Sequence, residues 1–190
     1  MNGALRVRII ALQALLVLVL GFASGFALYE GNFVNSFVHD QLASQKITFP
    51  AASTEVPGGA LDPAVFPASI RQYAGQQLVN GDQAYQYANN FIAVHLSKIG
   101  GGKAYAQFPS TGLTPAQTAT KATLFQGESL RAMLLNAWGW SQVAKYTVMA
   151  GIGLAIAAGL VLVALAFEVT LAVRSREQSP ARKVVTAQSH

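Results

Sequence analysis

The stretch YTVMAGIGLAIAAGLVLVALAF, residues Tyr146 to Phe167, decides the fold of this chain. It contains 22 residues and no charge. At about 1.5 Å of rise per helical residue it spans roughly 33 Å, slightly more than the hydrocarbon core of a bilayer. The stretch therefore predicts a membrane-spanning helix, to which we assign residues 146–173.

A second apolar stretch, Ile9 to Tyr29, follows Arg6 and Arg8 and contains 21 residues without a charge. It is long enough to span a bilayer as residues 9–29. A cleaved signal peptide is the alternative, because a basic start, an apolar run and small residues such as Gly25 and Ala27 are all present. The apolar run exceeds the ~7–15 residues usual in a signal peptide, which favours a retained span.

The composition of the whole chain also indicates a membrane protein. Of its 190 residues, 52% are hydrophobic and 11% are charged, whereas about 25% of residues are charged in a typical soluble domain. The sequence has no cysteine. It therefore lacks the residues for a disulfide framework, a thiol nucleophile or a cysteine-based metal site.

The net charge of +5 does not predict a nucleic-acid partner, because of where the charges lie. Six basic and two acidic residues flank the two apolar stretches, whereas seven basic and six acidic residues lie between Tyr29 and Lys145. Lysine and arginine next to a span set its orientation toward the cytoplasm. We expect a plasma-membrane protein with residues 1–8 and a disordered basic tail, 174–190, in the cytoplasm, and residues 30–145 outside.

Both spans are predicted to continue outward as helices. Apolar residues recur at helical spacing after Gly31, so the first helix should reach about Ser44. Thr114-Pro115 has the chemistry of a helix start, and no proline follows until Pro180, so the second helix should begin near Pro115 and run about 58 residues.

Two shorter helices are expected between the long ones. The first is predicted over Pro63 to Val79, with an interruption at Pro67, because Asp62-Pro63 resembles an N-cap and first helical position. The second is predicted over Gln83 to Ile99, capped by Asp82 and ended by the glycines that follow it. The predicted fold class is therefore an all-α membrane protein. An antiparallel two-helix transmembrane hairpin extends into an extracytoplasmic helical stalk, and the two shorter helices pack on this stalk.

Small residues recur every four positions in both predicted spans. Gly21 and Gly25 form a GxxxG motif, and Gly151, Ala155 and Gly159 repeat the spacing in the second span. Lipid chains are as apolar as helix surfaces, so helices in a bilayer associate through close packing of small faces. These residues predict helix packing, either within the hairpin or against another subunit.

Gln13 and Glu168 are polar residues in the inner-leaflet halves of the two spans. Gln13 lies five residues from Arg8 and Glu168 lies six from Arg174, so the two should sit within about 2 Å of the same depth. An antiparallel hairpin then predicts a hydrogen bond between them. An intramembrane carboxylate is also a candidate for ion or proton transport.

The predicted external segment contains two histidines that bear on metal binding. His39-Asp40 together with His95 has the composition of a two-histidine, one-carboxylate iron site. Their spacing matches no metal motif such as HExxH, and a histidine on the apolar face of a helix is more often a hydrogen-bonded core residue. We therefore expect no metal and no cofactor.

Three segments resemble, in order, a family of small actinobacterial two-span membrane proteins of unknown function, some of which are labelled aromatic-ring-opening dioxygenase. These segments are LASQKITFP (Leu42 to Pro50), YANNFIAVHLSKIGGGKAY (Tyr87 to Tyr105) and Ser129-Leu130-Arg131. The resemblance implies a two-span membrane protein, and it assigns no catalytic residue. The external candidate residues are His39 and the best matched positions, His95, Lys103 and Tyr105.

The function expected from the sequence is non-enzymatic. The chain has the pattern of an accessory or structural subunit of a larger membrane complex or homo-oligomer. Its expected partners are membrane lipid and other membrane-protein subunits or itself. A component of a homo-oligomeric channel or transporter is the alternative, because two spans joined by a large external loop is a known channel topology. Neither predicted span, however, carries a polar stripe or a selectivity-filter segment.

Overall fold

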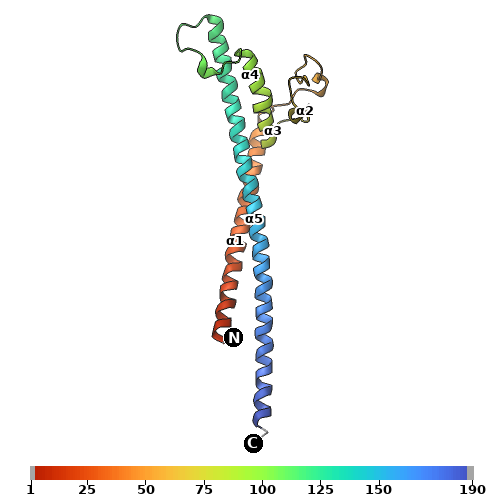
Figure 1. The fold of residues 1–190 in the computed structure, drawn as a ribbon, viewed down its shortest axis with the longest axis vertical. Coiled ribbons are helices and arrows are strands. Elements are labelled where there is room, and N and C mark those ends of the chain that lie inside the picture. Colours follow the sequence, from red (N-terminus) through yellow and green to blue (C-terminus); the bar gives the residue numbers. More distant parts are fainter. Residues whose placement is uncertain (1–2, 188–190) are drawn as a thin grey trace. The chain divides into compact units, whose positions relative to one another are not determined.

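The computed structural model describes the backbone of residues 3–187 and the side chains as far as Ser175. The chain divides into two units. Unit 1 comprises Met1–Gly31 and Tyr146–His190, and unit 2 comprises Asn32–Lys145. Two long helices, α1 (Gly3–Ser44) and α5 (Pro115–Ala187), each contribute to both units (Figure 1).

Both long helices are apolar enough to cross a membrane. Their most apolar 18-residue windows have a mean hydropathy of 2.3 in α1 and 2.6 in α5. Only 6% of each window is buried within the protein. A core helix of a soluble protein would be covered, whereas in a bilayer the lipid covers an apolar helix and the helix satisfies its own backbone hydrogen bonds.

The C-terminal end of α1 and the N-terminal end of α5 agree with their local sequence signals. Helix α1 ends at Ser44, as predicted. Helix α5 begins at Pro115, also as predicted. At this start the Thr114 hydroxyl accepts from the Gln117 amide (3.3 Å), and the Gln117 side chain accepts from the Thr114 amide (2.9 Å). This reciprocal pair satisfies backbone donors that have no partner within the helix.

The C-terminal end of α5 differs from the prediction. The helix has 73 residues and continues to Ala187, whereas the sequence predicts a disordered tail over residues 174–190. That prediction took Pro180 as the first residue that interrupts the helical sequence. A proline removes one helical hydrogen bond, and the Glu, Gln, Ala, Arg and Lys residues around it favour the helix.

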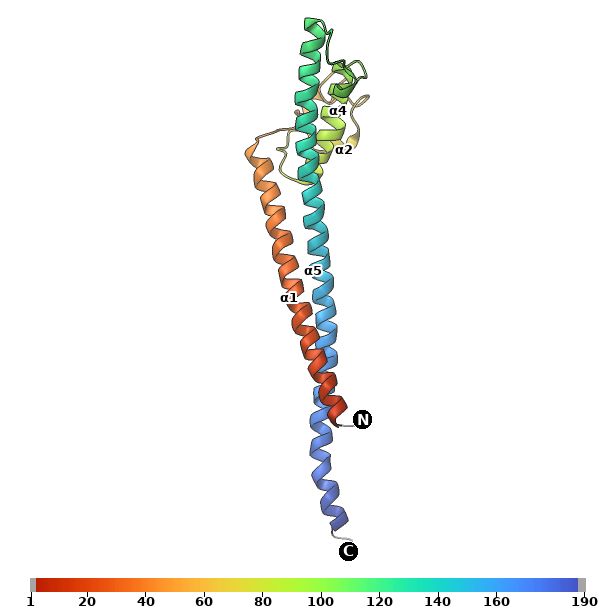
Figure 2. The same cartoon turned by 90° about the vertical axis from the view of Figure 1, so that its left-hand side faces the viewer.

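Short elements of unit 2 connect the two long helices. One of them, α4, lies beside the N-terminal part of α5 in both views (Figures 1 and 2). In chain order they are a 3₁₀ turn η1 (Ala52–Thr54), α2 (Ala68–Arg71), α3 (Gly81–Gln86), a π-helical turn η2 (Tyr87–Ile92), α4 (Ala93–Ile99) and a 3₁₀ turn η3 (Tyr105–Gln107).

The helix predicted over residues 63–79 is wrong except for four residues. The Asp62 carboxylate accepts from the amides of Gly58 (2.8 Å) and Ala64 (2.9 Å), so it closes a turn rather than capping a helix. Helix α2 starts only after Pro67 and has four residues. Gln77 then forms an isolated antiparallel bridge with Thr48.

The second predicted short helix is confirmed as a helical segment that runs continuously through α3, η2 and α4. Its cap is Asn80, not Asp82 as predicted. The Asn80 side chain accepts from the Gln83 amide (2.9 Å), and the Gln83 side chain accepts from the Asn80 amide (3.3 Å). The segment ends at Ile99, where the sequence predicts the end, and Gly101 and Gly102 then adopt φ values of 59° and 81°.

The core of unit 2 draws on both long helices as well as on the loops between them. Its largest fully buried side chains are Phe49, Leu61, Ile70, Leu78, Leu124 and Leu134. Helix α1 adds Val38 (6% exposed) and Leu42 (3% exposed). This core holds the C-terminal part of α1 in place, and the pocket described next depends on it.

Candidate functional site

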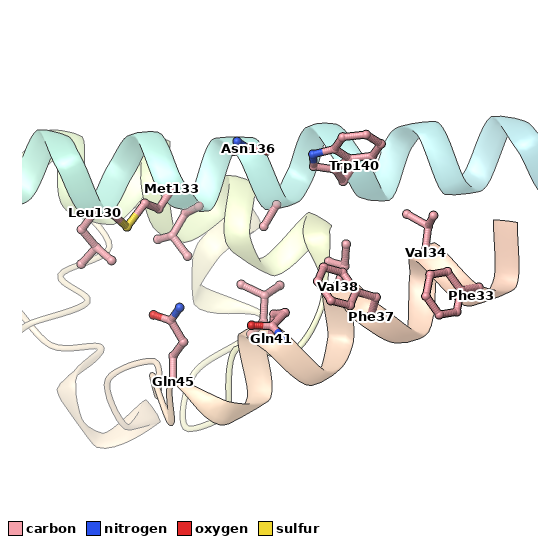
Figure 3. A pocket seen from close by; sticks show the side chains of 13 residues that line it. Phe33, Val34, Phe37, Val38, Gln41, Gln45, Leu130, Met133, Asn136 and Trp140 are labelled. Atoms are coloured by element: carbon pink, nitrogen blue, oxygen red, sulfur yellow. The ribbon is translucent and has the colours of Figure 1, made fainter. Parts of the chain in front are cut away.

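A pocket of about 460 Å³ lies in unit 2, walled by α1 and α5 (Figure 3). Phe33 and Trp140 lie at one end of the pocket, and Gln45 and Leu130 lie at the other. Phe33 in α1 and Gln45, the residue after the end of α1, are 12 positions apart, or about 18 Å at 1.5 Å per residue. The volume is in the range of about 300–1,000 Å³ that is typical of small-molecule sites.

The walls of the pocket are mainly apolar, because both helices carry apolar residues at helical spacing. On α5 these residues are Leu130, Met133, Leu134 and Ala137. Such spacing places side chains on one face of a helix. On α1, Val38 and Leu42 turn into the core of unit 2, whereas Phe33 and Phe37 stack on each other with ring centroids 6.5 Å apart.

Three amide side chains also line the pocket, and no charged residue does. These amides are Gln41, Gln45 and Asn136. Among the described residues, none of the three side chains forms a hydrogen bond with another protein group. Sequence reasoning did not select them, because a glutamine or asparagine on an exposed helix face is common, and only the pairing of α1 with α5 brings these three to one pocket.

His95 lies in an aromatic cluster within the core of unit 2. Its Nδ1 is 2.8 Å from the Phe91 carbonyl oxygen, which can only accept, so Nδ1 carries the proton. Its ring stacks on Phe66 with centroids 5.6 Å apart. Tyr87 belongs to the same cluster, and burial raises the pKa of its hydroxyl above the usual 10.0. The ring of His95 is thus held by one backbone carbonyl and by the rings of Phe66 and Phe91.

The other external candidates do not gather around His95. His39 contacts its neighbour Asp40, with 3.1 Å between Nδ1 and Oδ1. Lys103 is exposed, and the ring of Tyr105 packs on Phe125 with centroids 5.4 Å apart. In the part of the chain that the structure describes, no group of three or more His, Asp and Glu residues is placed to hold a metal ion. His39, Asp40 and His95 therefore do not form the iron-type set considered above.

Unit 1 contains a polar cluster around Arg6 and Glu168, but the partners in it differ from the prediction. Glu168 pairs with Arg6, with 3.6 Å between Oε2 and Nε. Arg6 also donates to the Ser175 hydroxyl (3.0 Å). The predicted hydrogen bond between Gln13 and Glu168 does not form, since the Gln13 Oε1 and Glu168 Oε2 atoms have no hydrogen-bond partner among the described residues.

The packing register of unit 1 explains this difference. Gly151 lies against α1, where the Ser24 hydroxyl donates to its carbonyl (2.8 Å) and Leu28 packs on its Cα. Glu168 is 17 residues further along α5, so it should lie opposite residues 7 to 11 of an antiparallel α1. Gln13 is about one turn too far from this level, and the long side chain of Arg6 reaches it instead.

The small residues predicted to pack the two helices differ in burial and in their contacts. Gly151 is buried, and a Cβ there would lie 2.9 Å from Leu28 Cγ, so this glycine permits the close approach of α1 and α5. Gly21, Gly25 and Gly159 are open, and a Cβ at any of them meets nothing within 4 Å. Ala155 is also exposed. Packing within unit 1 therefore uses one of the five predicted positions.

No protein-family model, curated protein or solved structure matches this chain.

Proposed function

We propose that this chain is a two-span plasma-membrane protein with both termini in the cytoplasm and residues 30–145 outside. Its role is that of a non-enzymatic accessory or structural subunit, which binds another membrane protein or a second copy of itself through its spans. The proposal combines the two long apolar helices with the basic residues beside them, which favour a cytoplasmic location for both ends.

The open GxxxG face of α1 is the observation that supports an accessory role. Gly21 and Gly25 are exposed, and no part of the described chain covers them. Helix association in a bilayer is favourable when a second helix packs closely on a GxxxG face. Because α5 packs against α1 at Leu28 and Ser24 instead, the motif remains available for a helix from another chain.

A comparison of glycine variants tests this proposal. We expect Gly21→Leu and Gly25→Leu to abolish the complex or homo-oligomer that is recovered after mild detergent solubilisation, because leucine keeps the partner helix at a distance. Gly153→Leu is the matched control, since this glycine is also open but lies outside both small-residue series. The measurement is mass by light scattering, combined with identification of the co-purified proteins.

Two results would contradict the accessory role. One is a wild-type protein that is purely monomeric and has no co-purified partner in native detergent. The other is an assembly that survives Gly21→Leu and Gly25→Leu as well as it survives Gly153→Leu.

A further inference from the structure

We infer that the pocket between α1 and α5 binds one hydrocarbon chain of a phospholipid from the outer leaflet. This inference rests on the proposed topology, which places residues 30–145 outside the membrane. It assigns a ligand to a cavity that the accessory role does not require.

The position of the pocket along the two helices points to the bilayer as the source of the ligand. Phe33 lies four residues beyond Tyr29, the last residue of the first uncharged run, and Trp140 lies six residues before Tyr146. At 1.5 Å per residue these intervals are about 6 and 9 Å. The headgroup region adds roughly 5–7 Å to each side of the hydrocarbon core. One end of the pocket should therefore lie at the level of the headgroups.

The residues that line the pocket select an uncharged, flexible and apolar group. None of them is charged, so the enclosed part of the ligand must be uncharged as well. The amides of Gln41, Gln45 and Asn136 can hydrogen-bond an ester or hydroxyl group. Met133 is 66% exposed and can adapt to the shape of a mobile chain.

The free energy of binding comes mainly from covering apolar side chains of the protein, and little of it comes from moving the hydrocarbon chain. A hydrocarbon chain that leaves the bilayer for an apolar pocket gains little, because both surroundings are apolar. Beyond the hydrocarbon core, however, Phe33 (57% exposed), Phe37 (55%) and Trp140 (56%) would face headgroups and water. Covering them with a chain removes this apolar surface from water, which is favourable.

The volume of the pocket favours a single chain over a helix from another protein. A helical segment 18 Å long and about 10 Å across displaces on the order of 1,400 Å³. This is about three times the 460 Å³ of the pocket. A helix would therefore cover the opening without entering, whereas one extended hydrocarbon chain is narrow enough to enter.

The two tryptophans of the sequence provide a direct test. Trp140 lines the pocket, whereas Trp138 packs on Tyr85 with ring centroids 4.9 Å apart. The full-length Trp138→Phe variant keeps Trp140 as its one tryptophan. It is reconstituted in phosphatidylcholine vesicles whose acyl chains carry bromines at a shallow, a middle or a terminal position, and bromine quenches tryptophan fluorescence on contact.

If a chain enters the pocket with its ester group at Gln41 and Gln45, its terminal carbons lie at the Trp140 end, and terminal bromines will quench Trp140 at least as strongly as shallow bromines do. Bulk lipid alone gives the opposite order, because terminal bromines then stay at the bilayer centre. Ala137→Leu fills the pocket and should restore the bulk order. Ala132→Leu, at an exposed position of the same helix that does not line the pocket, should leave the quenching unchanged.

Quenching that falls steadily with bromine depth in the Trp138→Phe variant would overturn the inference. So would a homodimer that Ala137→Leu dissociates without a change in quenching, because a second copy would then occupy the pocket. A separate experiment tests the topology itself, namely labelling of a single cysteine at an external position in intact cells. If that labelling succeeds and the quenching order is the bulk order, the lipid inference alone is wrong.

Discussion

Arg6 contacts three groups on α5 at the inner end of unit 1. Its guanidinium pairs with Glu168 (3.6 Å), donates to the Ser175 hydroxyl (3.0 Å) and approaches the Leu171 carbonyl (3.5 Å). A guanidinium has five N–H donors in a fixed fork, so one arginine can bind several acceptors at once. Arg6 therefore links the start of α1 to three positions of α5.

We expect the Arg6–Glu168 pair to stabilise unit 1 by about 1 kcal/mol, because both side chains are about one quarter exposed, at 24% and 26%. Thermal unfolding in detergent of Arg6→Ala, Glu168→Ala and the double variant measures this coupling. Arg8→Ala is the control, since Arg8 is exposed. Additive effects of Arg6→Ala and Glu168→Ala would mean that the pair contributes nothing.

Asn80 should contribute more to the stability of the α3–α4 segment than Asp82 does. We expect Asn80→Ala to cost about 1 kcal/mol, because the alanine leaves the Gln83 amide without its acceptor. Asp82→Ala should cost about 0.5 kcal/mol or less, since Asp82 only favours the positive end of the helix dipole. Hydrogen exchange of the amides in residues 81–99 reports both effects. Faster amide exchange in Asp82→Ala than in Asn80→Ala would mean that Asp82, not Asn80, is the more important cap.

The start of α5 could be predicted because its partners are local. Thr114 caps α5 through Gln117, three positions away. The partner of Glu168 was missed because it depends on how Gly151 packs against Leu28, which no local pattern encodes. The three amides of the pocket were missed for the same reason.

Among the elements, the fit of α3 against α5 depends on one glycine. A Cβ on Gly81 would overlap the side chain of Ser141, and it would lie 3.4 Å from the Trp138 Cα. We expect Gly81→Ala to destabilise unit 2 by roughly 1–3 kcal/mol, because α3 must then move away from α5.

Gly139→Ala is the matched control for Gly81→Ala. A Cβ on Gly139 meets nothing within 4 Å, so alanine should stabilise the helix by roughly 0.5–1 kcal/mol. The two free energies of unfolding, measured by denaturant titration, should therefore change in opposite directions. A decrease of similar size in both variants would contradict close packing at Gly81.

The ends of the long helices were predictable because caps and glycines act locally. Ser44, Pro115 and Ile99 are where the sequence places them. The segment 63–79 was not predictable, because Asp62-Pro63 starts a turn as readily as a helix. Its turn is fixed by Gly58, and its later part is fixed by the pairing of Gln77 with the distant Thr48.

At the scale of the whole molecule, the proposed topology predicts which residues an impermeant thiol reagent can reach. The chain has no cysteine, so each single-cysteine variant has one reactive site. We expect Ser110→Cys to be labelled in intact cells and Ala4→Cys to be labelled only after permeabilisation. Both positions are exposed, so burial does not prevent either reaction.

Labelling of Ala4→Cys in intact cells would contradict the cytoplasmic N-terminus. The intact mass of the purified protein separates a retained first span from a cleaved signal peptide. A mass that lacks the residues before Tyr29 would show that α1 loses its apolar part, and the two-span topology would then be wrong.

The shared core of unit 2 has a consequence for biosynthesis. Leu42 on α1 and Leu134 on α5 belong to the same core, but a ribosome adding about 5–20 residues per second needs on the order of 5–20 s to make the 92 residues from one to the other. During this interval Phe49, Leu61 and Phe66 have left the ribosome without their final neighbours. The apolar side chains of the nascent segment therefore lack the neighbours that bury them until α5 is synthesised, and during this time the segment is exposed to aggregation.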